Sequence, residues 1–504
     1  MFKSGIIVAF FTLLSRFFGL ARELFIANTF GTTIFADCVN VAFKFPNLFR
    51  RIFGEGALSS VFIPIFSKKL IESEDGARQF AGNIFFLLIL VLMAITVILE
   101  ITMPYLMLLI APGFYAKPEK FELAVALCRI TTPYLIFLSV IAILGGMLNS
   151  VRKFWALAFV PILMSSIVVL YTYYFQGRYT AHYSIAYSLI VAGIVQVTFM
   201  LFCVYRAKLL FSITYNRHDP SVMELLCKMG PAAVSSGAQQ LNLFISNSIS
   251  SFLPGAVSVL SYADRLYQLP LALIGITFGT ILLPELSKLY STQEYDRINI
   301  LQNKVVRVAL FISIPAMIGL FAMAEPIIHL IYERGEFLNK DTLITSKVLA
   351  GFALGLPAFT LAKIITPIYY ANLDTQSPLR ISLYSLLINT ILNILLMVPF
   401  GAVGIAVGSS ISAWINVYML ALGAKKYGNL KVSVSTKQFI GKVCVASCGM
   451  WLFIYSVNYY WNDLFFADSF FIKFISIIGV ISASILIFCL FSFMLNLHKV
   501  LYER

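Results

Sequence analysis

Charged side chains occur inside three segments that are otherwise apolar, and their types suit the binding of a charged ligand. These residues are Arg16, Arg22 and Glu23 within 5–29, Asp37, Lys44, Arg50, Arg51 and Glu55 within 34–66, and Asp264 and Arg265 within 256–286. A charge at the centre of a membrane helix costs about 2.5–3.5 kcal/mol, so such residues usually face a cavity or a partner. The group holds six cations and four anions. It therefore predicts a site that attracts an anion.

The spacing and the type of these residues favour phosphate as the bound group. Arg16 and Arg22 are six residues apart, which separates them by about 120° around a helix, so both can line one broad face. Asp37 and Lys44 are seven residues apart and share nearly the same face. Arg outnumbers Lys, and the planar guanidinium binds phosphate oxygens in pairs. The pattern favours a diphosphate headgroup over a neutral sugar or drug, with salt bridges that serve packing alone as the alternative.

The elements that must position these residues are membrane helices. Of the 504 residues, 60% are hydrophobic and 12% are charged, whereas soluble domains average about 45–50% apolar and 25% charged residues. About 20 apolar residues cross a bilayer, so nearly the whole chain fits within a membrane. This composition excludes a soluble enzyme, a disordered chain and a small disulfide-linked secreted protein. The seven cysteines form no Cys-x-x-Cys pair and are expected to be buried apolar residues.

Fourteen helical segments are expected, with short polar loops between them. They cover residues 5–29, 34–66, 80–111, 121–149, 154–176, 183–206, 222–252, 256–286, 304–332, 341–371, 377–399, 402–424, 437–460 and 470–496. Lys and Arg concentrate in alternate loops, which accounts for the net charge of +14 and predicts that both termini are cytoplasmic. In this topology Lys153, Arg206 and Lys426 face the cytoplasm, whereas Lys117 and Lys120 belong to an outer loop.

An internal repeat divides the first twelve segments into two sets of six. The residues Pro64, Ser67 and Lys68 recur 220 positions later as Pro284, Ser287 and Lys288. Two further prolines recur in order, with Pro104 and Pro133 matched by Pro326 and Pro357 at offsets of 222 and 224. Because six is an even number, the two sets have the same orientation in the membrane.

We therefore expect an all-α polytopic membrane protein with two parallel six-helix lobes around a central cavity. The predicted lobes are residues 1–215 and 216–428, and residues 429–504 hold two additional C-terminal helices. This is the usual architecture of an alternating-access transporter.

Several long motifs of the chain are specific enough to compare with known families. They are SRFFGLARE at 15–23, FG at 30–31, AD at 36–37, FKFPNLFRRIF at 43–53, EGA at 55–57, FIP at 62–64, SYADRL at 261–266 and GTILLP at 279–284. These motifs closely resemble the MurJ (MviN) family of bacterial lipid II flippases. The resemblance implies membership of the multidrug, oligosaccharidyl-lipid and polysaccharide exporter superfamily and a role in peptidoglycan synthesis.

The resemblance also implies an activity and a set of site residues. The implied activity moves lipid II, the undecaprenyl-diphosphate-linked disaccharide pentapeptide, from the cytoplasmic to the periplasmic leaflet by alternating access. Arg16, Arg22, Arg50 and Arg265 match the family's cavity arginines, and Glu23 and Asp37 match its acidic positions. The predicted substrate-binding set is completed by Ser15, Lys44, Glu55 and Asp264. The two C-terminal helices are expected to form a groove for the lipid tail.

The remaining expectations concern energy, partners and alternatives. The chain has no GxxxxGK phosphate loop, which argues against ATP hydrolysis within it. No cofactor and no metal are expected, and the membrane potential and an ion gradient both stay open as energy sources. Some family members couple to a cation through helices seven and eleven, where this chain offers Asn242, Asn247, Asn389, Thr390 and Asn393 but no acid beside the amides of helix seven.

Expected partners are lipid II, membrane lipids and other cell-wall synthesis proteins, with no nucleic acid, for a monomer in the bacterial inner membrane. The main alternative is a drug/cation antiporter or another polyprenyl-linked oligosaccharide exporter of the same superfamily. A membrane-bound transferase and a silent scaffold are weaker alternatives, because the chain shows neither clustered acidic metal ligands nor a large polar domain, and a scaffold would not need buried arginines.

Overall fold

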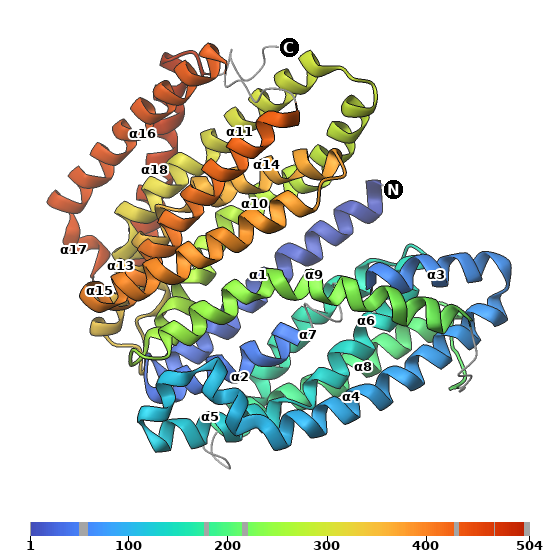
Figure 1. Ribbon diagram of the computed structural model, residues 1–504. Coiled ribbons are helices and arrows are strands. Elements are labelled where there is room, and N and C mark those ends of the chain that lie inside the picture. Colours follow the sequence, from blue (N-terminus) through green and yellow to red (C-terminus); the bar gives the residue numbers. More distant parts are fainter. Residues whose placement is uncertain are drawn as a thin grey trace. The chain divides into compact units, whose positions relative to one another are not determined.

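The computed structural model describes residues 2–49, 59–175, 181–213, 220–427, 433–467 and 469–497, and these residues form helices joined by short turns (Figure 1). The chain divides into two compact units, Met1–Val257 and Ser258–Arg504. The expected all-α fold is confirmed. In the described part of the chain, nine helical stretches are long and apolar enough to cross a membrane, which is consistent with the predicted count of fourteen.

The described residues of the first unit form nine α-helices and a short 3-10 helix. They are α1 (Phe2–Phe30), α2 (Ile34–Phe49), α3 (Ser59–Glu72), α4 (Glu74–Ile110), η2 (Pro112–Ala116), α5 (Pro118–Thr131), α6 (Tyr134–Ser150), α7 (Trp155–Phe175), α8 (Ala181–Arg206) and α9 (Pro220–Ser250). Helix α7 packs against α1 and α8, whereas α9 packs against α3 and α4. Division of the chain by its contacts therefore assigns α9 to the same unit as the preceding helices. The lobe boundary at 215/216 rests on the internal repeat instead, and it stays a prediction.

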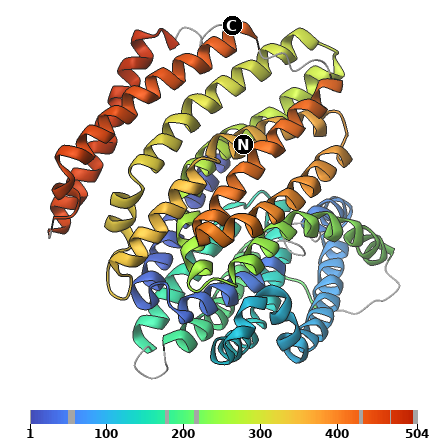
Figure 2. The same cartoon turned by 60° about the vertical axis from the view of Figure 1, so that its left-hand side comes forward.

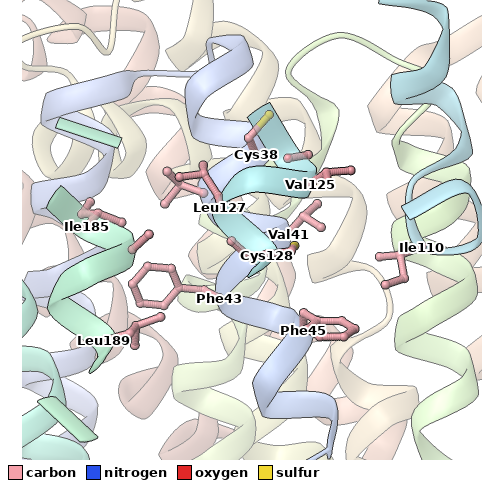
Figure 3. Close-up of a cluster of buried hydrophobic side chains, with 14 of the residues drawn as sticks. Cys38, Val41, Phe43, Phe45, Ile110, Val125, Leu127, Cys128, Ile185 and Leu189 are labelled. Carbon is pink, nitrogen blue, oxygen red and sulfur yellow. The ribbon is translucent and has the colours of Figure 1, made fainter. Parts of the chain in front are cut away.

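Apolar side chains hold α2 in the middle of the first unit. Val41, Phe43 and Phe45 of α2 are buried in one cluster with residues of α5 and α8. Figure 3 shows these side chains beside Cys128 of α5 and Leu189 of α8. Apolar residues of α5 and α8 thus cover α2. Buried polar side chains near the start of α2 therefore need hydrogen-bond partners from neighbouring segments.

The second unit consists of the remaining helices. They are α10 (Ala256–Ser291), α11 (Tyr295–Ala322), α12 (Ala324–Tyr332), α13 (Asn339–Ala353), α14 (Leu356–Ala371), α15 (Gln376–Ala424), η3 (Lys425–Tyr427), α16 (Val434–Tyr460), α17 (Asn462–Phe465) and α18 (Phe470–Met494). Helices α16 and α18 lie side by side next to α11 (Figure 2). The two C-terminal helices are thus part of this compact unit, and the boundary predicted at 428/429 stays a prediction.

Several predicted segments are interrupted where proline or glycine disturbs the helix. The segment expected at 121–149 is divided between α5 and α6 next to Pro133, and that at 341–371 is divided between α13 and α14 next to Pro357. Helix α15 contains a non-helical residue, Gly401, with φ 59° and ψ −136°. This kink lies in the gap predicted between segments 377–399 and 402–424. Glycine adopts such a positive φ without the strain that a Cβ would cause.

One turn is repeated in the two units with the same backbone. After α6, the amide of Lys153 donates to the Leu148 carbonyl at 2.9 Å, and after α14 the amide of Asp374 donates to the Tyr369 carbonyl at 2.9 Å. The residues before these donors, Arg152 and Leu373, have positive φ of 61° and 59°. This is the left-handed helix cap in which glycine is usual. The offset is 221 in every case, so the internal repeat extends to the detail of a helix end.

Candidate anion-binding site

Arg22 and Glu23 form an ion pair inside the first unit. Both lie on α1 and are 6% exposed, and Arg22 Nη2 donates to Glu23 Oε1 at 2.8 Å. The Arg22 guanidinium carbon lies 5.3 Å from the centre of the Phe43 ring. Among the described residues the buried Nε of Arg22 has no hydrogen-bond partner, although a guanidinium carries five N–H donors. Arg22 is therefore a desolvated cation with donors to spare, which phosphate oxygens would accept.

Arg16 and Ser15 precede this pair on α1, and both are half-buried. Ser15 Oγ donates to the Thr12 carbonyl at 2.8 Å. Its single proton is therefore used within the helix. This arrangement makes the two arginines, rather than Ser15, the α1 side chains suited to hold phosphate.

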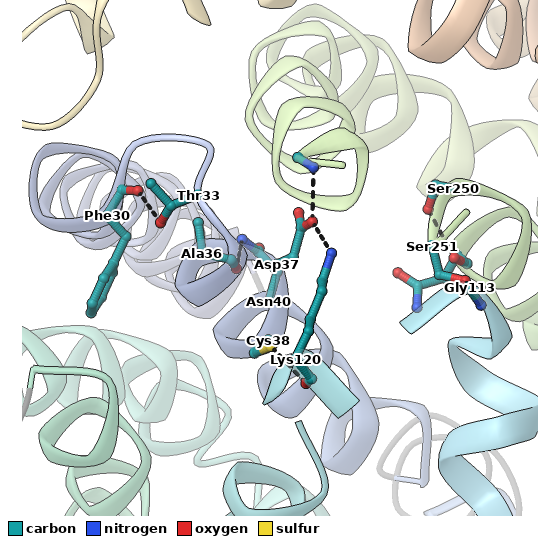
Figure 4. Close-up of polar contacts among 12 residues, drawn as sticks. Phe30, Thr33, Ala36, Asp37, Cys38, Asn40, Gly113, Lys120, Ser250 and Ser251 are labelled. Atoms are coloured by element: carbon teal, nitrogen blue, oxygen red, sulfur yellow. Dashed lines mark hydrogen bonds and ion pairs between the residues drawn. The ribbon is translucent and has the colours of Figure 1, made fainter. Parts of the chain in front are cut away.

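Asp37 is fully buried near the start of α2 and accepts hydrogen bonds from two other segments. Its Oδ2 accepts from Lys120 Nζ at 2.7 Å and from the Gly255 amide at 2.9 Å (Figure 4). A buried carboxylate is tolerated only when it is paired and hydrogen-bonded. Asp37 therefore ties together α2, α5 and the turn after α9, whereas Glu23 bonds a neighbour on its own helix.

Lys120 is the site residue that the sequence prediction missed. We expected it in a polar outer loop, but it lies in the first turn of α5, is 4% exposed, and its Nζ is 3.9 Å from the centre of the Phe114 ring. A cation in the first turn opposes the helix dipole. That unfavourable position was the one signal in the sequence that Lys120 requires an acidic partner.

Further polar contacts join α9 to the neighbouring helices of the first unit, close in sequence to the Gly255 amide that bonds Asp37. We call this set of residues the polar collar, and it comprises Asp37, Lys44, Lys120, Asn247, Ser248 and Ser251. Lys44 Nζ donates to Asn247 Oδ1 at 3.3 Å, although Lys44 remains exposed. Ser248 Oγ donates to the Ile110 carbonyl at 3.0 Å, and Ser251 Oγ accepts from the Gly113 amide at 2.9 Å. The collar therefore binds the C-terminal end of α9 to α2, α4 and η2.

Two glycines allow the backbone to approach closely within the collar. A Cβ on Gly113 would lie 2.4 Å from the Phe252 amide nitrogen, and one on Gly255 would lie 2.7 Å from the Thr32 carbonyl oxygen. Gly255 also has a φ of +73°. Both neighbours are backbone atoms, so neither position accepts a larger residue without displacement of the turn after α9.

The other predicted site residues fall in two groups. Asp264 and Arg265 lie on α10 in the second unit, are half-buried, and Asp264 shares a hydrogen bond with Gln268. Arg50 and Glu55 lie outside the described residues. The structure thus pairs Arg22 with Glu23 and brings Asp37 and Lys44 into one collar.

Of the residues predicted for cation coupling, Asn389, Thr390 and Asn393 lie on α15, whereas Asn242 and Asn247 lie on α9. Asn393 is fully buried, and neither its Oδ1 nor its Nδ2 has a partner among the described residues, while Thr390 Oγ1 donates to the Leu386 carbonyl at 2.8 Å. The side chain of Asn242 lies outside the described residues. No transport step is assigned to a bound cation at these residues.

Comparisons with known proteins give a consistent family. A sequence model described as lipid II flippase MurJ matches residues 26–480. A Rickettsia prowazekii protein named "Probable lipid II flippase MurJ" is 51% identical over 479 residues, which cover 95% of this chain and 94% of that protein.

Solved structures agree with this family. A structure titled "Lipid II flippase MurJ, inward closed conformation" has a TM-score of 0.81 and 27% identity, and the match covers 97% of this chain and 98% of that chain. An inward-facing multidrug resistance MATE family transporter of the MOP superfamily has a TM-score of 0.70 and 13% identity, over 84% of this chain and 97% of that chain. This second likeness shows the fold alone. The chain belongs to the lipid II flippase MurJ family, whose members are transporters rather than enzymes.

Proposed function

We propose that this chain moves lipid II from the cytoplasmic to the periplasmic leaflet of the inner membrane, with Arg22 as the central ligand of the lipid diphosphate. Membership of the MurJ family and the names of the relatives support the substrate. The observation that carries the role of Arg22 is its burial beside a single carboxylate with an unpartnered Nε. A diphosphate would complete the hydrogen bonding of a guanidinium that is already out of water.

The other α1 residues support this role. Glu23 keeps the empty site from carrying an uncompensated buried cation, and it orients the guanidinium from the neighbouring position. Arg16, six residues earlier on α1, supplies the second charge that a diphosphate requires. Arg50, Arg265, Glu55 and Asp264 stay in the proposed site on the resemblance alone.

The polar collar supplies the closed end that alternating access requires. By the charge of the loops, this end of the first unit faces the periplasm. Release of the headgroup on that side would break the bonds from Gly255 to Asp37, from Lys44 to Asn247 and from Gly113 to Ser251. Lipid II shifts this equilibrium only by the difference between its affinities for the closed and open forms. The contacts of the collar therefore set how much of the binding energy of lipid II is needed to open this end of the first unit.

A drug/cation antiporter, the main alternative, would be expected to present acids to its substrate. The spare donors of Arg22 suit an anion instead. Both termini in the cytoplasm, a monomeric state, contacts with other cell-wall synthesis proteins and a lipid-tail groove along α16 and α18 stay part of the proposal.

The test is transport of labelled lipid II in reconstituted vesicles, read as exposure of its headgroup on the far side. Arg22→Gln should reduce transport to background while the protein stays folded. The matched control is Arg297→Gln, because Arg297 is 73% exposed and its pair with Glu294 contributes little. Normal transport by Arg22→Gln would overturn the proposed role of the arginine. Wild-type protein that moves no lipid II under an imposed potential, proton gradient or sodium gradient would overturn the proposed substrate.

A further inference from the structure

A cavity of about 390 Å³ lies in the first unit where α6, α7 and α8 meet. Its lining includes two cations, Lys153 from the turn after α6 and Arg206 from the end of α8. Three aromatic side chains, Trp155, Phe199 and Phe202, line the same cavity. Its volume is in the range of ligand sites. None of these residues belongs to the predicted transport site.

The internal repeat shows what the second unit places at the same positions. The counterpart of Lys153 is Asp374, at the offset of 221 that relates the two turns, and the counterpart of Arg206 is Lys426, at an offset of 220. In the second unit these residues form an ion pair, with Lys426 Nζ 2.8 Å from Asp374 Oδ2. This ion pair connects the turn after α14 to the short helix η3 at the end of α15.

The first unit has a lysine, Lys153, at the position that corresponds to Asp374. The cavity is therefore lined by two cations, Lys153 and Arg206, instead of by a cation and an anion. Among the described residues, neither Lys153 nor Arg206 is hydrogen-bonded to or ion-paired with a carboxylate. The Arg206 guanidinium lies 5.6 Å from the centre of the Phe202 ring. Two like charges on one cavity are mutually repulsive. An external anion would take the place that Asp374 fills in the second unit.

The aromatic wall indicates the kind of anion. Phe202 is 56% exposed and Trp155 is 40% exposed, and the rings of Trp155 and Phe199 meet edge to face at 6.0 Å. Exposed aromatic rings at a helix end are typical of the level at which lipid headgroups meet the acyl chains. Basic pockets between helix ends at this level bind phosphate headgroups. We propose that this cavity binds the phosphate of an anionic phospholipid through Lys153 and Arg206, with the lipid chains along Phe202 and Trp155.

Trp155 provides a direct probe of this site. The chain has four tryptophans, so replacing Trp414, Trp451 and Trp461 by Phe leaves Trp155 as the only emitter. Such protein would be placed in phosphatidylcholine vesicles that contain either brominated phosphatidylglycerol or brominated phosphatidylcholine at the same mole fraction. We expect Trp155 to be quenched at roughly tenfold lower content of the anionic lipid than of the zwitterionic lipid. Equal quenching by the two lipids would overturn the proposal.

Lys153→Asp is the sharpest variant, because it copies the ion pair of the second unit. The new carboxylate should pair with Arg206, keep the turn folded and abolish the preference for the anionic lipid. Lys208→Asp is the matched control: Lys208 is exposed, lies two residues after Arg206, undergoes the same charge change and does not line the cavity. The preference of the Lys208→Asp variant for the anionic lipid should stay as in the wild type. Equal loss in the two variants would mean that only the general surface charge attracts lipid, and would overturn the site.

Two further measurements separate loss of lipid binding from loss of folding, and a lipid ligand from a soluble phosphate ligand. If Lys153→Asp lowers the thermal midpoint, the Lys153→Gln, Arg206→Gln double variant replaces it, and an unchanged lipid preference in that variant would contradict the proposal. Soluble glycerol phosphate at millimolar concentration should leave the quenching unchanged. Displacement of the brominated anionic lipid by glycerol phosphate would assign the cavity to a soluble phosphate ligand instead.

Discussion

Among the described residues of the first unit, two buried ion pairs differ in the hydrogen-bonding capacity that they leave unused. Arg22 and Glu23 are neighbours on one helix, and the Arg22 Nε has no partner among the described residues. Asp37 and Lys120 are 83 residues apart, and Asp37 also accepts from the Gly255 amide. The ion pair of Arg22 and Glu23 joins neighbouring positions of one helix and leaves an Arg22 donor for a ligand, whereas the pair of Asp37 and Lys120 connects three segments. Burial of a charge thus identifies a site only when hydrogen-bonding capacity remains.

The largest effect is expected from breaking the connecting pair. Lys120→Met leaves the buried Asp37 carboxylate without its cation, and the free energy of unfolding should fall by about 3–5 kcal/mol. The measurement is chemical unfolding in detergent, with Lys117→Met, an exposed neighbour, as control. The Asp37→Asn, Lys120→Met double variant should recover much of the lost free energy of unfolding. In this variant no charge is buried at position 37, and the oxygen of the new side-chain amide can still accept from the Gly255 amide. Unchanged stability of Lys120→Met would show that the pair does not hold this end together.

A smaller effect is expected from a change of shape in the collar. Gly113→Ala places a Cβ 2.4 Å from the Phe252 amide nitrogen, and overpacking of this kind costs about 1–3 kcal/mol. Because the cost falls on the closed arrangement, the collar end should open more often. Spin labels at Tyr115→Cys and Phe252→Cys, both exposed positions, would report longer distances in a background without the native cysteines.

The control for this variant is Gly76→Ala, whose Cβ would meet Ser73 Cβ at an ordinary 3.6 Å. It should leave the distance distribution unchanged. The same distribution in Gly113→Ala and wild type would contradict the claim that close backbone approach maintains the collar.

The smallest effect is expected at the ion pair of the second unit between Lys426, which is exposed, and Asp374, which is half-buried. Asp374 accepts from Lys426 and from the Ser377 amide, and these bonds lower the pKa of Asp374. A lowered carboxylate pKa adds stability above the ordinary value of 3.8 and loses it as the pH falls through the folded value.

Asp374→Asn should therefore lower the thermal midpoint by at most about 2–4 °C, because Lys426 is 51% exposed and an ion pair open to water on one side contributes little. The difference from wild type should be constant between about pH 5 and 9, where both groups keep their charge. Thermal unfolding across this range is the measurement. A difference that disappears within it would show that another titrating group holds the turn.

Much of the fold follows from apolar patterning, because each membrane span must bury its own backbone hydrogen bonds. The kink at Gly401 and the breaks beside Pro133 and Pro357 lie at residues that disturb helices, so local chemistry was sufficient there. The buried charges of α1 and α2 were found because a charge in an apolar run is costly wherever it lies.

Partners distant in sequence could not be predicted. Lys120 follows Pro118 and Glu119 in a polar stretch, so nothing nearby indicates that it folds onto Asp37, 83 residues earlier. Likewise, the association of α9 with α3 and α4 depends on packing between residues more than a hundred positions apart. Sequence reasoning identifies which residues require partners, and tertiary structure decides which partners they receive.

The central claim is that Arg22 binds a diphosphate, and the direct test is the affinity of purified protein for polyprenyl diphosphate and polyprenyl monophosphate of equal chain length. Wild-type protein should prefer the diphosphate. Arg22→Lys keeps the charge but loses paired hydrogen bonding, so the preference should fall by roughly tenfold, about 1.4 kcal/mol, and it should vanish in Arg22→Gln. An Arg22→Gln protein that retains the full preference for the diphosphate would contradict the claim.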